Sequence, residues 1–181
     1  ELSNYLNIKN IKKIEGYDVS HISGHDAVAS CVIFSKSGPA KSNYRLFNIP
    51  MNIAGNDIGS LEHVMKRRLK YYDDPKIKPD LILIDGGKTQ LKFVNEVIKK
   101  SKHKNLNVIS IVKGINRVRA TETIISKNGV IELDKYSKAF LLLQEIRDES
   151  HRFALKSQRK KKNKPTRTSK DGIISEIEVL I

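Results

Sequence analysis

The sequence contains a single cysteine, Cys31, and no cluster of cysteine and histidine residues at zinc-ligand spacing. One cysteine cannot build a disulfide framework, and its place in the apolar stretch VASCVIF fits a core position in a reducing compartment. No run of 18 apolar residues is present, so no transmembrane helix is encoded. No signal-peptide pattern follows Glu1, and we expect a soluble part of a longer protein.

Acidic residues are scarce relative to basic ones. The 34 lysines and arginines against 20 aspartates and glutamates give a formal net charge of +14. Such an excess attracts polyanions, most simply nucleic acid. The alternative is a compositional bias of the source, since lysine, asparagine and isoleucine are all frequent. The 181 residues suffice for one domain with a substantial core and a short appendage.

Alternating or apolar stretches between polar loops predict strands, and apolar residues at helical spacing predict helices. The predicted strands are 14–20, 27–38, 43–49, a run ending at Asp85, 107–113, and a hairpin over 121–133 with Asn128-Gly129 at its tip. The predicted helices cover 56–72, 88–101 and 137–157, with Asn56 or Asp57 able to cap the first.

This order of elements is an antiparallel three-strand meander followed by β-α-β units. It predicts an α/β domain with a ribonuclease H-like fold, in which helices flank a mixed central sheet. We assign residues 14–157 to this domain, 1–13 to the end of a preceding linker, and 158–181 to a basic linker and the truncated start of another module. In such a fold the first and fourth strands lie side by side at the centre of the sheet.

Each of these two strands carries an aspartate, Asp18 in GYDVSH and Asp85 in LILIDGG. Two carboxylates that meet in a crevice repel each other unless a cation or a proton lies between them. Oxygen ligands with open coordination favour Mg²⁺ or Mn²⁺, which supports phosphodiester hydrolysis. The alternatives are structural: Asp18 caps a turn with Ser20, and Asp85 binds the amides of Gly86 and Gly87.

A third group for such a site is available in the last predicted helix, in the stretch RDESHRF. His151 lies roughly 140° around the helix from Ile146, the centre of the apolar stripe. A histidine so placed is free to face a crevice or solvent. It could ligate a metal through a neutral ring nitrogen or move a proton.

Four stretches resemble motifs of one family, in that family's order and spacing. They are YDVSHISG (17–24), AVASCVIFSKSGPAKSNYRLFNI (27–49), PDLILIDGGKTQL (79–91) and LLLQEIRDESHRFAL (141–155). They resemble the C-terminal endonuclease half of UvrC, the nuclease subunit of bacterial nucleotide excision repair. The resemblance implies a ribonuclease H-like fold with a divalent metal and an Asp-Asp-His triad, which falls by position on Asp18, Asp85 and His151. A further family acid falls on Asp57, but Asn56 departs from the family pattern, so we expect Asp57 to cap the helix and not to have an auxiliary role in the site.

The same resemblance implies a bacterial, cytoplasmic enzyme that makes the 5′-side incision at lesions in double-stranded DNA. Its other modules would include an N-terminal nuclease, a segment that binds a UvrB-type helicase subunit, and a C-terminal helix-hairpin-helix domain; no membrane partner is implied. Basic residues within the matching motifs are candidates for phosphate contacts: Lys41, Arg45, Lys88, Arg147 and Arg152. Two other functions remain open, a non-catalytic DNA-binding or assembly module and a ribonuclease acting on RNA–DNA hybrids.

Overall fold

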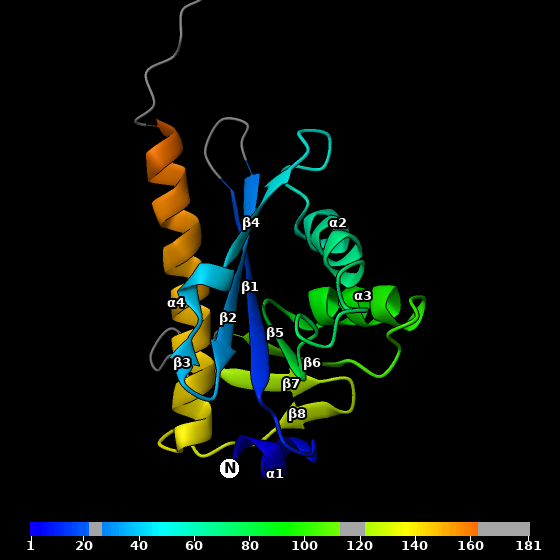
Figure 1. Ribbon diagram of the computed structural model, residues 1–181, viewed down its shortest axis with the longest axis vertical. Coiled ribbons are helices and arrows are strands. Elements are labelled where there is room, and N and C mark those ends of the chain that lie inside the picture. The colour runs from blue at the N-terminus through cyan, green and yellow to red at the C-terminus, as the bar shows by residue number, and fades with distance from the viewer. Residues whose placement is uncertain (22–26, 113–121, 163–181) are drawn as a thin grey trace, which may run out of the picture.

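The computed structural model describes residues 1–21, 27–112 and 122–162, and within them one mixed sheet runs through the whole molecule (Figure 1). The strand order is β3-β2-β1-β5-β6-β7-β8, and β4 pairs with β2 beside this path. The contacts of β5 with β1 and with β6 are parallel, and the other pairings are antiparallel. The strands are β1 (Lys13–His21), β2 (Ala27–Ser35), β3 (Gly38–Pro39), β4 (Arg45–Ile49), β5 (Leu81–Asp85), β6 (Asn107–Val112), β7 (Thr123–Ser126) and β8 (Gly129–Ile131).

Helices cover both faces of this sheet. The long helix α4 (Lys138–Lys162) packs along β1, β2 and β5, while α2 (Asp57–Leu69) and α3 (Lys88–Lys99) pack together on the other side (Figure 1). A short helix α1 (Leu2–Leu6) and the 3₁₀ turn η1 (Lys41–Asn43) complete the elements of the described residues. Among these residues, no helix combines the length and the apolar character that crossing a membrane requires.

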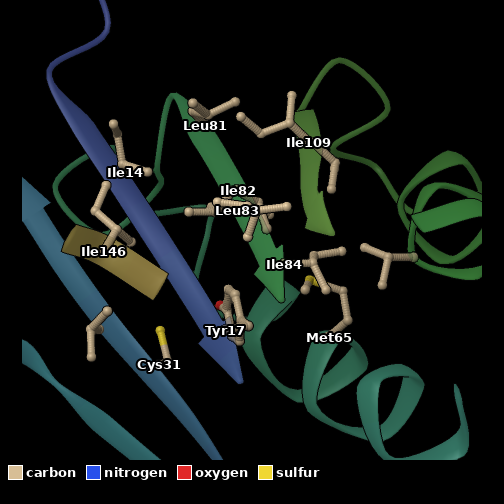
Figure 2. Packing of buried hydrophobic residues seen from close by; sticks show 14 of the residues in the cluster. Ile14, Tyr17, Cys31, Met65, Leu81, Ile82, Leu83, Ile84, Ile109 and Ile146 are labelled. Atoms are coloured by element: carbon tan, nitrogen blue, oxygen red, sulfur yellow. The ribbon is translucent and has the colours of Figure 1, made fainter. Parts of the chain in front are cut away.

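The apolar run that ends at Asp85 forms the centre of the core. Leu81 to Ile84 are at most 1% exposed, as expected for a parallel strand covered on both faces. Figure 2 shows this strand between β1 and β6, with Met65 of α2 and Ile146 of α4 packed around it. The approach of α4 to β1 is close, because a Cβ atom on Gly16 would lie 2.4 Å from Cγ2 of Ile146.

The predicted α/β fold is confirmed, including the meander of β1, β2 and β4 and the adjacency of β1 and β5. The helix predicted to end at residue 157 continues to Lys162, because the lysine- and arginine-rich stretch that follows contains no glycine or proline before that point. Within the predicted linker 1–13, Leu2 begins α1 and is buried against the core. The hairpin turn lies one residue earlier than predicted, at Lys127-Asn128, with Gly129 at φ +121° opening β8.

Candidate functional site

The candidate site lies where β1 and β5 run side by side in the same direction. Their register pairs Tyr17 with Ile84, so the next residue of each strand, Asp18 and Asp85, occupies the corresponding position. Because side chains alternate between the two faces of a sheet, both aspartates belong to the face opposite Tyr17. That is the face covered by α4, to which Gly16 of β1 also belongs.

Helix α4 brings His151 onto Asp18. The ring nitrogen Nδ1 of His151 lies 3.3 Å from Oδ2 of Asp18 across 133 residues of sequence. Asp18 is 6% exposed, whereas the His151 side chain is 55% exposed. The predicted position of His151 outside the apolar stripe is therefore confirmed, and the ring lies between a buried carboxylate and solvent.

Two serines fix the geometry of this pair. The hydroxyl of Ser20, two residues along β1 on the same face, donates to Oδ2 of Asp18 at 2.6 Å. The hydroxyl of Ser30, the register partner of Asp18 on β2, donates to the carbonyl of Ser150 at 2.7 Å and so fastens α4 next to His151. The bond from Ser20 lies within a continuous strand, so Asp18 does not cap a turn.

The turn after Asp85 is held by other groups. The amide of Gly86 donates to the carbonyl of Ile111 at 3.3 Å, and the amide of Gly87 donates to Oε1 of Gln90 at 2.7 Å. Both amides have their acceptors elsewhere, so the alternative in which the Asp85 carboxylate serves them is not what the structure shows. The same Gln90 side chain fits closely over Gly86, where a Cβ would meet its atoms at 3.3 Å.

The donors present at this edge fit a divalent cation in type. Within residues 1–21, 27–112 and 122–162, both hydrogen-bond partners of Asp18 meet at Oδ2, which leaves Oδ1 to a cation. Carboxylate oxygen is the ligand that Mg²⁺ and Mn²⁺ prefer. In the same ranges, no three His, Cys, Asp or Glu side chains form a ready-made metal cluster. His151 is paired with Asp18 directly, and Asp85 belongs to the neighbouring strand.

The basic residues predicted to contact phosphates are spread over different parts of the surface. Lys41 and Arg152 border a hollow beside α4 that also contains Glu145, Asp148 and Glu149. Arg152 donates to Glu149 at 2.6 Å, and this hydrogen bond lowers the pKa of the Glu149 carboxyl.

The other three candidates are not among the residues that line that hollow. Arg147 is mostly covered and pairs with Glu122 and Asp148, so its charge is already compensated. Arg45 donates to the backbone carbonyls of Ser42 and Tyr44. Lys88 is exposed and opens α3, three residues after Asp85.

Sequence reasoning missed Glu122 and Ser30. Glu122 accepts from Gln144 at 2.7 Å and pairs with Arg147, which holds α4 against the residue directly before β7. Ser30 contacts a residue 120 positions away. No local pattern announces either contact, because each depends on how α4 returns across the sheet. The neighbouring pair Asp18 and Ser20, in contrast, shares a face by simple strand alternation.

Asn56 and Asp57 divide the role at the start of α2. The side chain of Asn56 accepts from the amide of Gly59 at 3.0 Å and is the N-cap. Asp57 is the first residue of the helix, where a negative charge favours the helix dipole. The helix is therefore capped by Asn56 and not, as expected, by Asp57.

Comparison with known proteins gives a consistent result. The model of the UvrC RNAse H endonuclease domain matches residues 3–155. UvrABC system protein C of Legionella pneumophila (strain Paris) is 40% identical over 158 residues, which is 86% of this chain and 26% of that protein. The corresponding protein of Pseudomonas aeruginosa (strain LESB58) is 39% identical over 161 residues, or 87% of this chain and 26% of its own length. The chain therefore spans about a quarter of the length of these relatives.

Solved structures support the fold. Endonuclease V of Ciona intestinalis, in a complex with a 23mer DNA that contains an inosine, superposes with a TM-score of 0.56 at 11% identity, covering 88% of this chain and 94% of that one. The catalytic domain of human Endonuclease V gives 0.52 at 14% identity, covering 84% and 85%. At such identities the likeness concerns architecture alone. The family match over residues 3–155 and the two relatives establish that this chain belongs to the UvrC RNase H endonuclease domain family.

Proposed function

We propose that this domain hydrolyses a DNA phosphodiester bond on the 5′ side of a lesion during nucleotide excision repair. The observation that carries the proposal is the contact between Asp18 and His151, at the end of β1 next to the strand that carries Asp85. Family membership supports nuclease chemistry and implies a divalent metal cofactor. The side of the cut, the lesion-bearing duplex and a UvrB-type helicase partner reached through the rest of a longer protein are finer parts of the same proposal. So is a location in the bacterial cytoplasm.

Asp18 and Asp85 would hold the metal, Mg²⁺ or Mn²⁺, with Oδ1 of Asp18 as the available oxygen. When bound, such an ion supplies a Lewis acid at the phosphate and lowers the pKa of a coordinated water. Burial strengthens the role of Asp18, because a 6% exposed carboxylate interacts with charge in a medium of reduced dielectric constant.

His151 would complete the site through its other ring nitrogen, as a metal ligand or as a proton carrier. Its Nδ1 faces Oδ2 of Asp18, so the opposite ring nitrogen, Nε2, is the one available to the reacting groups. A carboxylate on one ring nitrogen fixes the ring orientation and the proton position of the other. The exposed ring can then take a proton from the attacking water or deliver one to the leaving oxygen.

Ser20 has a positioning role. Its hydroxyl donates to the oxygen of Asp18 that faces His151, and thereby holds the carboxylate in a rotamer in which Oδ1 would be available to a metal. The carboxylate then has two separate tasks, one for each oxygen. Removal of the Ser20 hydroxyl would let the Asp18 carboxylate rotate, so that either oxygen could face His151 or the metal.

The deciding experiment is an incision assay with Asp85→Asn in the full protein that contains this domain. The assay uses its loading partners and a lesion-bearing duplex whose 3′-side cut has been made beforehand, so that only the 5′ cut is measured. Asn keeps the size of Asp85 and removes its charge, so incision should fall by about a hundredfold or more while DNA affinity is kept. Near wild-type incision would show that the site is elsewhere.

The two other functions give different results in the same series. A non-catalytic DNA-binding module would bind the duplex and leave it uncut at every metal concentration. A ribonuclease H-type enzyme would cut an RNA–DNA hybrid faster than the damaged duplex. Parallel reactions on the damaged duplex and on the RNA–DNA hybrid therefore distinguish the three functions.

A further inference from the structure

A basic groove lies outside the candidate site, between α3 and the hairpin of β7 and β8. It is a hollow of about 420 Å³ whose lining includes Lys88 but none of Asp18, Asp85 and His151. Its apolar floor includes Leu91 and Ile125, both buried. Four lysines and one acid border it: Lys88, Lys92, Lys99, Lys127 and Glu96.

Three of the lysines form a row along α3. Lys88, Lys92 and Lys99 are four and seven residues apart, which places them on one side of the helix. At 1.5 Å per residue the row is about 16 Å long. Lys127, in the turn between β7 and β8, faces the row from the other wall.

The lining of this groove has an excess of positive charge, four lysines against the single acid Glu96. Within the described residues, none of the four lysines forms an ion pair or hydrogen bond through its side chain, and all four are exposed. The hollow beside α4 differs, since there Lys41 and Arg152 share the lining with three acids and Arg152 is already paired. Charge complementarity to a polyanion is therefore concentrated along α3.

We propose that the groove along α3 binds the sugar-phosphate backbone of a DNA strand that passes over the carboxyl end of β5. This proposal rests on the proposed nuclease function. A DNA strand that passes from Asp85 over this edge of the sheet meets Lys88 first, because only Gly86 and Gly87 lie between Asp85 and Lys88 in the chain. The length of the row matches about five phosphates of one strand at 3.4 Å each. The lysines neutralise phosphates, and the floor of Leu91 and Ile125 contacts the sugars.

The test compares two triple variants of the same net charge. The groove variant is Lys92→Gln/Lys99→Gln/Lys127→Gln, and the control variant is Lys36→Gln/Lys70→Gln/Lys104→Gln, whose lysines are exposed on other parts of the surface. The dissociation constant for a fluorescent DNA duplex is measured by anisotropy at several salt concentrations. The groove variant should lose two to three units of the slope of log K against log salt, at roughly 0.9 per phosphate contact. The control should lose less than one unit.

A covalent probe locates the strand independently of affinity. Cys31 is fully buried, so a cysteine introduced by Lys92→Cys is the reactive thiol of the described surface. DNA that carries a bromoacetamide group tethered to a backbone phosphate should alkylate this thiol, with bromide leaving, and should not alkylate Lys70→Cys to a similar extent.

The outcomes separate this proposal from the nuclease function. If the two triple variants bind DNA alike, or if Lys70→Cys reacts as fast as Lys92→Cys, the groove proposal is wrong while incision still depends on Asp85. If the groove variant loses binding and Asp85→Asn still permits incision, the groove stands and the active site has been misplaced. A groove that binds an acidic protein segment instead would leave the DNA affinities of both variants equal, which overturns the proposal.

Discussion

Glu15 and Asp18 are carboxylates three residues apart on β1, and they occupy opposite kinds of surroundings. Glu15 is 0% exposed on the face covered by α2. Its oxygens accept from Arg68 (Nη2 at 2.5 Å), from the hydroxyl of Tyr17 at 2.6 Å and from that of Tyr72 at 2.5 Å. Asp18 lies on the other face, near the end of the strand, and its partner His151 is open to solvent.

The difference shows how one strand separates stability from chemistry. A buried charge costs several kcal/mol unless partners saturate it, and Glu15 is saturated. Such a carboxylate has no capacity left for a substrate or a metal. Asp18 has two partners on one oxygen only among the described residues, which leaves capacity for catalysis. The same residue class therefore performs two tasks because the pleat directs its members to different faces.

Of the substitutions that test the contrast between Glu15 and Asp18, we expect the largest effect on catalysis from one at Asp18. Asp18→Asn removes the charge that orients His151 and would hold the metal, so the 5′ incision rate should fall about a thousandfold or more. The midpoint of urea unfolding should change little, because the amide keeps the shape of the carboxylate. The assay is the incision of a pre-nicked lesion duplex by the full protein. A variant that unfolds at markedly lower urea would mean that Asp18 is structural as well.

The second largest effect concerns the stability that the buried pair of Glu15 and Arg68 provides. Arg68→Met leaves the Glu15 carboxylate buried without its cation, and the free energy of unfolding should fall by about 3 kcal/mol. The double variant Glu15→Leu/Arg68→Met should recover part of this loss, since no lone charge remains. Urea unfolding measures both. The exposed pair of Glu62 and Lys66 on α2 provides the control, because breaking it should cost less than about 0.5 kcal/mol.

These two carboxylates also show what sequence can and cannot predict. The strand alternation around Tyr17 and the apolar run before Asp85 were sufficient to predict β1 and β5, because local periodicity determines both. Their adjacency was predicted from the order of elements, which is that of a ribonuclease H-like fold. The partner of Glu15 was not predictable in this way. Arg68 follows 53 residues later on a helix whose orientation depends on tertiary packing.

The triad residues needed the family motifs as well. Periodicity placed His151 outside the apolar stripe but left its partner open, and the bond to Asp18 depends on how α4 crosses β1 at Gly16. The contacts of Ser30 and Glu122 with α4 likewise arise from that crossing. The groove along α3 went unpredicted for a related reason: the row of lysines is visible in the sequence, but the opposing wall at Lys127 comes from another element.

A smaller effect is expected from the serine that supports Asp18. Ser20→Ala removes the hydrogen bond to Oδ2 of Asp18, so the incision rate should fall about tenfold. The apparent affinity for the metal should fall as well. Ser20→Thr keeps a hydroxyl at the same position and should restore most of the activity. Metal titrations of the incision rate distinguish this positioning role from a loss of stability.

The matched control for that series is Ser35→Ala. Ser35 lies at the far end of β2, and its hydroxyl contacts Ser37 and the carbonyl of Gly38, away from the site. Equal losses of activity in Ser20→Ala and Ser35→Ala would mean that a general weakening of the sheet, and not the orientation of Asp18, explains the effect.

The smallest effect is a dependence of stability on alkaline pH that comes from the buried side of the comparison. Burial, and then the negative charge of Glu15, raise the pKa of the Tyr72 hydroxyl well above its ordinary value of 10.0. In the unfolded chain this hydroxyl loses its proton near pH 10, whereas the folded protein retains it. The contribution of the Tyr72 hydroxyl to the free energy of unfolding is therefore complete below pH 10. It is lost as the pH rises from there toward the pKa of Tyr72 in the folded protein. The free energy of unfolding should fall with a slope of at most about 1.4 kcal/mol per pH unit for this group.

Tyr72→Phe should make that fall shallower between pH 10 and 11, at the cost of one hydrogen bond to Glu15 at neutral pH. Tyr71→Phe, at an exposed neighbouring residue, should leave the slope as it is. Urea unfolding of the three proteins at pH 8, 10 and 11 provides the comparison, and identical slopes for wild type and Tyr72→Phe would show that Tyr72 does not retain its proton in the folded protein.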